Sequence, residues 1–257
     1  MNLPPLDLHA HINPSISEDD LYELGAVVFA VSRSLDEAAV LLGRDDETTI
    51  WGVGCHPGLV GAHSAFSASR FDQLLESTAF AGELGLDGKS RVAFQTQLGT
   101  LRSALNVLAE KPRIVSLHNY AATEAIVLEL ARIQSPGRVL HWWLGDEDIT
   151  RRAVDLDCYF SLPPSAAKRR PDLLDAIPLD RVLTETDHPF GDRRSSEPRP
   201  GNVDAVERAL ARHHAIEQEE VRRTVWHNLA RLTKDVGCGR LLPRRVRMLL
   251  AALPPPT

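Results

Sequence analysis

The chain has 257 residues, of which 43% are hydrophobic and 25% charged, with a formal net charge of −6. This composition excludes a disordered chain, a fibrous repeat and a disulfide-rich miniprotein, and the acidic balance argues against binding nucleic acid through overall positive charge. The sequence has no apolar run long enough to span a membrane, no secretory signal and only three cysteines. We therefore expect a cytoplasmic protein that makes no membrane contact.

Eight short apolar runs alternate with polar segments of helical period. The runs cover residues 5–12, 26–32, 49–56, 80–87, 113–120, 138–145, 158–164 and 181–190. Ser17 with Asp20, and Ser34 with Glu37, have the spacing of helix capping boxes. Strands that alternate with helices predict a parallel sheet, and eight such units predict a single α/β fold, the (β/α)8 TIM barrel.

The end of the chain differs in composition from the rest. Residues 238–257 contain four arginines and no acidic residue, and they include three consecutive prolines. We predict a barrel domain over residues 1–237, followed by a basic C-terminal helix and a proline-rich tail. The helix is expected to pack on the barrel, and the alternative is a docking surface for a partner.

Ionisable residues interrupt the apolar runs near their ends. Asp7, His9 and His11 alternate in the first run and are expected to point to one side. Later runs add His56, Glu83, His118, His141 and Asp187. The carboxyl ends of barrel strands converge on one mouth, where active sites form. Buried ionisable groups need partners, so we expect a metal site rather than many independent core contacts.

Four histidines and two carboxylates are more ligands than one tetrahedral ion uses. We therefore predict two divalent ions bound by His9, His11, Glu83, His118, His141 and Asp187. Imidazole suits zinc or manganese better than magnesium, but the sequence does not decide among Mg²⁺, Mn²⁺ and Zn²⁺. Such a pair activates water for phosphoryl transfer. Glu83 is the expected bridge, and Asp187 is expected to bind an ion and accept a proton from water.

Other candidate nucleophiles carry less weight. Ser116 and Ser161 are expected to lie in strands without a nearby base. Cys55 adjoins His56 but faces the opposite side of its strand, so a buried thiol is expected. Of Trp142 and Trp143, one is expected in the core and the other at the surface, where it could stack on a sugar or base.

Six motifs together resemble the TatD family of metal-dependent deoxyribonucleases. They are Asp7-Leu-His9-Ala-His11, Gly54-Cys-His56-Pro57, Gly82-Glu83-Leu-Gly85-Leu-Asp87, Leu117-His118, Leu140-His141 and Glu185-Thr-Asp187-His-Pro189. The resemblance implies a TIM barrel that hydrolyses DNA, commonly from a 3′ end, with divalent metals. It also implies that His9 and His11 bind the first metal with Asp187, that Glu83 bridges, and that His118 and His141 complete the second.

The sequence departs from the family pattern at several positions. Tyr120 stands where the family often has the arginine of H-x-R-x-A, and Gly58 replaces a second histidine after Pro57. His188 and Phe190 replace the alanine and tyrosine of E-T-D-A-P-Y. Arginines of the following loop, including Arg199, are candidate phosphate contacts. The predicted substrate-binding residues are His56, Tyr120, Trp142, His188, Arg193 and Arg194.

Two segments, LHWW with YFSLPP and VLTETDHPF, look more like the QatD type of antiphage defence systems than like the housekeeping type. That likeness implies protein partners from a defence operon. Two alternatives to a DNA hydrolase stay open: an amidohydrolase-like enzyme acting on a small amide, lactone or phosphoester, and a non-catalytic scaffold of a defence complex. Because only neutral histidines bind metal, metal affinity is expected to fall below about pH 6.5.

Overall fold

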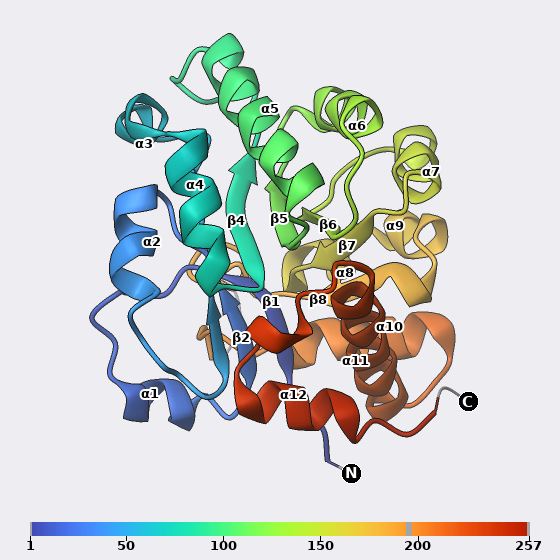
Figure 1. Cartoon of the computed structure of the whole chain (residues 1–257). Helices are drawn as coiled ribbons and strands as arrows, with labels where there is room; N and C mark the ends of the chain where they lie inside the picture. The colour runs from blue at the N-terminus through green and yellow to red at the C-terminus, as the bar shows by residue number, and fades with distance from the viewer. Residues whose placement is uncertain (1, 194–196, 256–257) are drawn as a thin grey trace.

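Eight parallel strands stand at the centre of the molecule, and helices surround them (Figure 1). The computed structural model describes residues 2–193 and 197–255. The strands are β1 (Leu6–Ala10), β2 (Val27–Ala30), β3 (Thr49–Trp51), β4 (Phe80–Gly85), β5 (Ile114–His118), β6 (Arg138–His141), β7 (Tyr159–Leu162) and β8 (Val182–Thr184). Each predicted run contains one strand, so the expected order of elements is confirmed.

The strands form two parallel groups, β1-β2-β3 and β4-β5-β6-β7-β8. The chain just beyond β3 pairs with β4. There, the Gly82 N–H of β4 donates to the Val53 carbonyl at 2.9 Å. On the other side, the Asp187 N–H donates to the carbonyl of His9 at 2.9 Å, just beyond β8. The sheet therefore closes on itself, and the predicted (β/α)8 barrel is confirmed.

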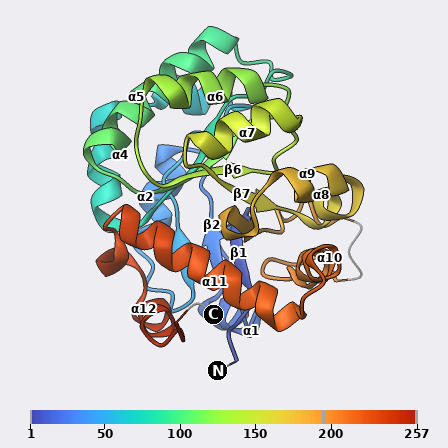
Figure 2. The same cartoon turned by 90° about the vertical axis from the view of Figure 1, so that its right-hand side faces the viewer.

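Most helices lie on the outside of the barrel, following the strands in chain order (Figure 2). Ser17 and Ser34 cap the first two helices by accepting the N–H of Asp20 and Glu37, as the capping-box spacing predicts. The helices are α1 (Glu18–Glu23), α2 (Leu35–Leu41), α3 (Val60–Ala65), α4 (Ala68–Leu74), α5 (Phe94–Glu110), α6 (Thr123–Arg132), α7 (Glu147–Asp155), α8 (Pro164–Arg169), α9 (Pro171–Ala176), α10 (Asp204–His214), α11 (Gln218–Asp235) and α12 (Arg244–Ala251). Short 3-10 turns occupy Leu75–Ser77, Leu179–Arg181 and Gly239–Leu241.

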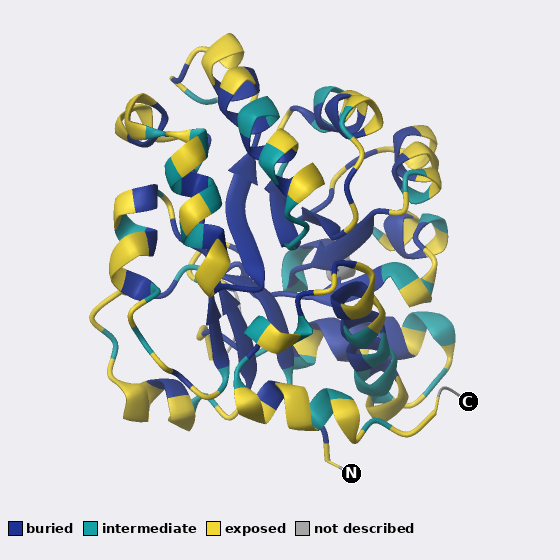
Figure 3. Cartoon of the chain, in the orientation of Figure 1, coloured by how far each residue is buried: buried dark blue, intermediate teal, exposed yellow. Residues whose placement is uncertain are grey.

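The strands are buried almost throughout, and exposed residues lie on the outer faces of the helices (Figure 3). A parallel sheet covered by helices is buried on both sides, which explains the nearly continuous apolar runs. A charged residue inside such a strand is costly unless it has partners. We therefore expect the polar residues within the strands to have a function other than packing.

The C-terminal helix α12 lies beside α1 and α11 (Figure 1). It packs through Val246, which is fully buried, while the Arg245 guanidinium lies 5.4 Å from the ring centroid of Tyr22 and 3.4 Å from the Glu47 carboxylate. The domain boundary between residues 237 and 238 stays a prediction. Within residues 2–193 and 197–255, no helix is both long and apolar enough to cross a membrane.

Candidate metal centre

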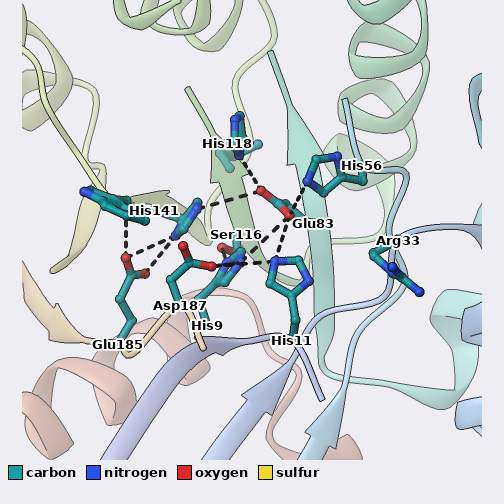
Figure 4. Close-up of polar contacts among 12 residues, drawn as sticks. His9, His11, Arg33, His56, Glu83, Ser116, His118, His141, Glu185 and Asp187 are labelled. Carbon is teal, nitrogen blue, oxygen red and sulfur yellow. Dashed lines mark hydrogen bonds and ion pairs between the residues drawn. The ribbon is translucent and has the colours of Figure 1, made fainter. Parts of the chain in front are cut away.

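The predicted ligands come together at the carboxyl ends of the strands (Figure 4). Four of the ligands lie within strands β1, β4, β5 and β6, one in each. The other two lie just after β1 and β8. The ligands are His9, Glu83, His118 and His141, with His11 and Asp187 beyond the strands. The convergence of barrel strands thus joins residues from both ends of the sequence.

Glu83 is the hub of this cluster. Its Oε2 lies 3.4 Å from the Nε2 of His11 and 3.9 Å from that of His9. Its Oε1 lies 2.5 Å from His118 Nδ1 and 3.8 Å from His141 Nε2. The side chain is 1% exposed. Both carboxylate oxygens therefore face imidazoles, which is the arrangement that a bridging carboxylate needs.

Asp187 lies opposite Glu83. Its Oδ1 is 3.6 Å from the Nε2 atoms of both His9 and His11. The residue has a φ of 44°, in the left-handed region that residues other than glycine rarely adopt. Such strain persists where surrounding contacts impose it, commonly at functional sites. Here the hydrogen bond from its N–H to the His9 carbonyl fixes the turn.

Three groups of donor atoms are near enough to one another to hold a metal ion. Within each group the donor atoms lie within 4.8 Å of one another, and the groups are His9-His11-Asp187, His9-Glu83-His141 and His56-Glu83-His118. His9 Nε2, Glu83 Oε2 and His118 Nε2 are buried without a hydrogen-bond partner. Leaving such atoms unpaired costs about 1–3 kcal/mol each. Imidazole and carboxylate are ligands of zinc and manganese, so these residues fit a divalent metal.

Glu185 orients His141. Both of its carboxylate oxygens lie 3.1 Å from His141 Nδ1, and Oε1 accepts the backbone N–H of Trp142 at 2.9 Å. A carboxylate beside Nδ1 keeps a hydrogen on that atom, so Nε2 is the nitrogen that faces the cluster and that a metal would take after losing its proton. The sequence analysis quoted Glu185 in a motif but assigned it no role. Its position two residues before Asp187 was the available signal.

Ser116 and Ser161 also support the cluster, and the expectation that no base lies near them is wrong. Ser116 Oγ lies 2.7 Å from His9 Nδ1, and the Ser161 hydroxyl donates to Glu185. Both hydroxyls belong to fully buried residues in β5 and β7. Because substrate cannot reach them there, they orient the buried groups and do not serve as nucleophiles.

The expectations for Cys55 and the tryptophan pair are confirmed. Cys55 is a buried free thiol, and burial raises its pKa to about 12, which removes it as a nucleophile at neutral pH. Trp143 is fully buried, and its indole N–H donates to the Thr150 hydroxyl at 2.8 Å. Trp142 is partly exposed and lines the pocket at the barrel mouth.

His56 is the cluster member that the sequence analysis assigned to the substrate. Its Nε2 lies 3.4 Å from Glu83 Oε2. Its Nδ1 accepts the backbone N–H of Gly58 at 2.9 Å, so the neutral ring carries its hydrogen on Nε2. In this tautomer Nε2 is a donor and has no lone pair for a metal. The geometry therefore agrees better with a hydrogen bond to an anionic substrate than with ligation.

Burial and neighbouring charges shift the pKa values of several ligands. Burial lowers the pKa of His9 well below its ordinary value and that of His11 to about 4, so both are neutral at physiological pH. Burial alone would lower the pKa of His141, but the Glu185 carboxylate raises it to about 10. Burial also raises the pKa of Asp187 well above its usual range.

Burial raises the pKa of Glu83 as well, but the histidines around it outweigh this effect and hold that pKa well below the ordinary value. Without metal, the Glu83 carboxylate is therefore ionised. At neutral pH His141 carries a proton, burial favours the protonated form of Asp187, and His9 and His11 are still neutral at pH 6.5. The expected fall in metal affinity at about pH 6.5 therefore does not come from His9 or His11.

Metal binding is expected to release protons and to strengthen as the pH rises between about pH 6 and pH 9. A metal ion takes only the unprotonated Nε2 of His141, whose pKa of about 10 leaves it protonated throughout this interval. Each proton released raises affinity about tenfold per pH unit. Calorimetric titration with Mn²⁺ or Zn²⁺ in buffers of different ionisation enthalpy counts these protons. Metal binding to Glu185→Gln should release fewer protons than binding to the wild type. A binding heat that does not depend on the buffer would contradict the release of a proton from His141.

Asp7 does not join the metal-binding groups of the described residues, although it was expected to point the same way as His9 and His11. Its carboxylate accepts the Thr186 N–H at 2.9 Å, the Thr186 hydroxyl at 2.6 Å and the Gly201 N–H at 2.8 Å. The pairing of β1 with β2 shifts register after Asp7. Asp7 thus ties the first strand to the segment that carries Asp187.

Asp7→Ala is expected to lower the free energy of unfolding by about 3 kcal/mol, because it removes the acceptor of the Thr186 N–H, the Thr186 hydroxyl and the Gly201 N–H. Urea unfolding followed by circular dichroism measures this loss. Asp7→Asn keeps an acceptor oxygen and should lose less stability. An unchanged unfolding midpoint for Asp7→Ala would show that the three hydrogen bonds do not hold the segment.

A pocket of about 400 Å³ opens above the cluster. Tyr120 and Trp142, both predicted substrate contacts, line it together with Asn119, Leu144 and Phe190. The polar cluster forms its floor and these residues form its side. A substrate in this pocket would meet the candidate ligands at one end and mostly apolar surface at the other.

The other predicted substrate contacts have different positions. His188 Nδ1 lies 2.8 Å from Asp192 Oδ2, and this pair stands beside the site. The Arg193 guanidinium is 5.3 Å from the ring centroid of Phe190, so it lies at the rim. Arg194 lies outside the described residues. Arg199 is exposed in the same loop.

Arg33 is a cation at the mouth that the sequence analysis missed. It follows β2, and its carbonyl accepts the His56 N–H at 3.0 Å. Figure 4 shows its side chain beside His11 and His56, and its charge helps to lower the pKa of His11. Its partner is Glu37, 3.2 Å away. The sequence signal was its position just after the second apolar run.

This barrel, with histidines and carboxylates gathered around a buried glutamate at its mouth, defines a metal-dependent hydrolase. The family model described as TatD related DNase matches residues 6–234. The chain belongs to this family, and the resemblance expected from the motifs is confirmed.

Individual relatives agree with this assignment. The metal-dependent hydrolase YabD of Bacillus subtilis (strain 168) is 25% identical over 253 residues, which cover 88% of this chain and 97% of YabD. The crystal structure of YjjV, a TatD homologue from Escherichia coli K12, has the same fold, with a TM-score of 0.79 at 22% identity over 88% of this chain and 96% of YjjV. The 3′-5′ ssDNA/RNA exonuclease TatD of Edwardsiella piscicida is 29% identical over 162 residues, 57% of this chain and 60% of that protein.

Proposed function

We propose that this protein hydrolyses phosphodiester bonds of DNA with two divalent metal ions and removes nucleotides from a 3′ end. The observation that carries the proposal is the position of Glu83, whose two oxygens face histidines on both sides in a buried cluster. The exonuclease name of the Edwardsiella relative supports the substrate. The ions would be Mg²⁺, Mn²⁺ or Zn²⁺.

The donor groups divide about Glu83. We assign His9, His11 and Asp187 to the first ion, and His118 and His141 to the second, with Glu83 shared between them. When bound, two such ions lower the pKa of a water molecule and neutralise charge on the phosphoryl oxygens. The three buried atoms of the cluster that lack a hydrogen-bond partner all belong to these six ligands, which supports the assignment.

The remaining steps are assigned to side chains. Asp187 accepts the proton of the attacking water, and its buried carboxylate is a stronger base than an exposed one. Glu185 holds His141 in the tautomer that presents Nε2. His56 donates its Nε2 hydrogen to a phosphate oxygen, and Arg33 and Arg193 supply positive charge from two loops of the rim. Arg33 would thus replace the arginine that the family motif places at Tyr120.

A small phosphoester, amide or lactone is the second candidate substrate, because the pocket lies toward the small end of the usual range for ligand sites. The scaffold alternative has less support, since a scaffold needs no buried, mutually oriented set of metal ligands. The antiphage role and operon partners rest on the two QatD-like segments of the sequence. Copurification of native partners that depends on neither metal nor Glu83 would favour the scaffold.

The test is a degradation assay on single-stranded and duplex oligonucleotides labelled at either end, with Mg²⁺, Mn²⁺ and Zn²⁺ added separately to metal-stripped protein. The proposal predicts metal-dependent release of mononucleotides, with a 5′ label surviving on a ladder of shortened products. Intact DNA under every metal, together with hydrolysis of a small ester, would move the assignment to the second candidate.

A further inference from the structure

A second pocket, of about 440 Å³, lies at the amino ends of β6, β7 and β8. Several of the residues that line it begin these strands or lie just before them, namely Ser135, Arg138, Tyr159 and Arg181. Strand β6 begins with Arg138 and ends with the candidate ligand His141. This pocket is therefore at the opposite end of the barrel from the metal centre.

Arg138 is a buried cation in the lining of this pocket. It is 6% exposed, and its Nη1 and Nη2 donate to the backbone carbonyls of Leu130, at 2.9 Å, and Leu156. These carbonyls lie at the carboxyl ends of α6 and α7 and offer only partial negative charge. The Nε–H of Arg138 has no hydrogen-bond partner among the described residues. A buried charge without an opposite charge is costly, so the guanidinium favours an anion in the pocket.

Two hydroxyl groups of the same lining are also unpaired. Ser135 is 5% exposed and Tyr159 1% exposed, and neither hydroxyl has a hydrogen-bond partner within residues 2–193 and 197–255. Arg181 and Arg231 add two more guanidiniums, and that of Arg181 lies 5.2 Å from the centroid of the Tyr159 ring. The pocket thus combines three unpaired buried donors with two further cations.

These donors suit a phosphate group. A phosphate monoester has three terminal oxygens and a charge of about −1.5 to −2 at pH 7, and arginine is well suited to bind it. The acidic residues of the lining, Asp157 and Asp235, are exposed, and Asp157 already pairs with Arg181 at 2.9 Å. The buried part of the pocket, where Arg138 lies, therefore carries positive charge.

We propose that this pocket binds the phosphate group of a small phosphate monoester through Arg138, Ser135 and Tyr159, at a site separate from the metal centre. The volume of about 440 Å³ is within the range of sites for small organic ligands, so the organic part of the ester has room beside Arg181 and Arg231. This proposal does not depend on the proposed hydrolysis of DNA. It gives these residues no part in the chemical step.

The test is equilibrium dialysis of radiolabelled inorganic phosphate against the metal-stripped full chain at fixed ionic strength, which gives the number of bound ions and the Kd. Tyr159→Phe and Ser135→Ala each remove one unpaired hydroxyl, and both should fold because no hydrogen bond within the described chain is lost. Arg138→Gln removes the buried charge. Tyr22→Phe is the matched control, because Tyr22 is 58% exposed on α1, outside the pocket.

The wild type should bind phosphate at this pocket, and acetate at equal concentration should not displace it. Tyr159→Phe and Ser135→Ala should each raise the Kd roughly tenfold, Arg138→Gln should abolish binding, and Tyr22→Phe should match the wild type. No bound phosphate, displacement by acetate, or an unchanged Kd in both hydroxyl variants would overturn the proposal. Binding that is lost in Arg33→Ala but kept in Tyr159→Phe would place the ion at the metal centre and would overturn it too.

Discussion

Glu83→Ala is expected to abolish metal-dependent release of nucleotides from DNA, with a loss of at least roughly 10³-fold in kcat/KM. The reason is geometric, because one buried carboxylate faces imidazoles from β1, β5 and β6 and is assigned to both ions. Metal ions supply several kcal/mol of charge stabilisation, and each 1.36 kcal/mol is a factor of ten in rate. Removing the shared ligand should lower the metal content as well as the rate.

Two further variants make this result specific. Glu83→Gln keeps the size of the side chain but removes its charge, and it should fail almost as completely. Glu110→Ala removes an exposed glutamate at the end of α5 and should leave metal content and rate unchanged. Substantial activity in Glu83→Gln, with metal bound, would show that Glu83 is a packing residue of the barrel rather than the bridge.

Asp187→Asn is expected to lower kcat by about 10²- to 10⁴-fold, the range associated with loss of a positioned proton acceptor. Asparagine keeps an oxygen near His9 and His11, whose Nε2 atoms lie 3.6 Å from Asp187 Oδ1, so the protein should still fold and retain part of its metal. The decisive measurement is the dependence of kcat on pH. The rise in kcat that follows ionisation of the Asp187 carboxylate should be absent in the variant. A variant with normal kcat and raised KM would instead make Asp187 a binding residue.

The fold and the core of the site could be predicted because both follow from short-range patterns. Residues two apart on a strand share a side, and the carboxyl ends of parallel strands meet, so His9, His11 and Glu83 could be grouped without coordinates. The eight apolar runs each contain one strand because a sheet covered on both sides requires continuous apolar sequence.

The supporting contacts could not be predicted, because they join residues remote in sequence. Ser116 meets His9 only because β5 faces β1 across the barrel, and Glu185 meets His141 only through the closure of β6, β7 and β8. The tautomer of His56 depends on a local hydrogen bond from Gly58. Asp7 was expected to point to the same side as His9 and His11, but its oxygens accept hydrogen bonds from Thr186 and Gly201.

The assignment of a two-metal centre is best tested by a crystal structure of the protein soaked with Mn²⁺, with anomalous difference maps recorded for the wild type and Glu83→Ala. We expect two peaks in the wild type, one beside His9, His11 and Asp187 and the other beside His118 and His141, with Glu83 between them. We also expect the loss of at least one peak in Glu83→Ala. A wild-type map without a peak at this cluster, or a Glu83→Ala map with both peaks intact, would contradict the assignment of these strand ends as a metal centre.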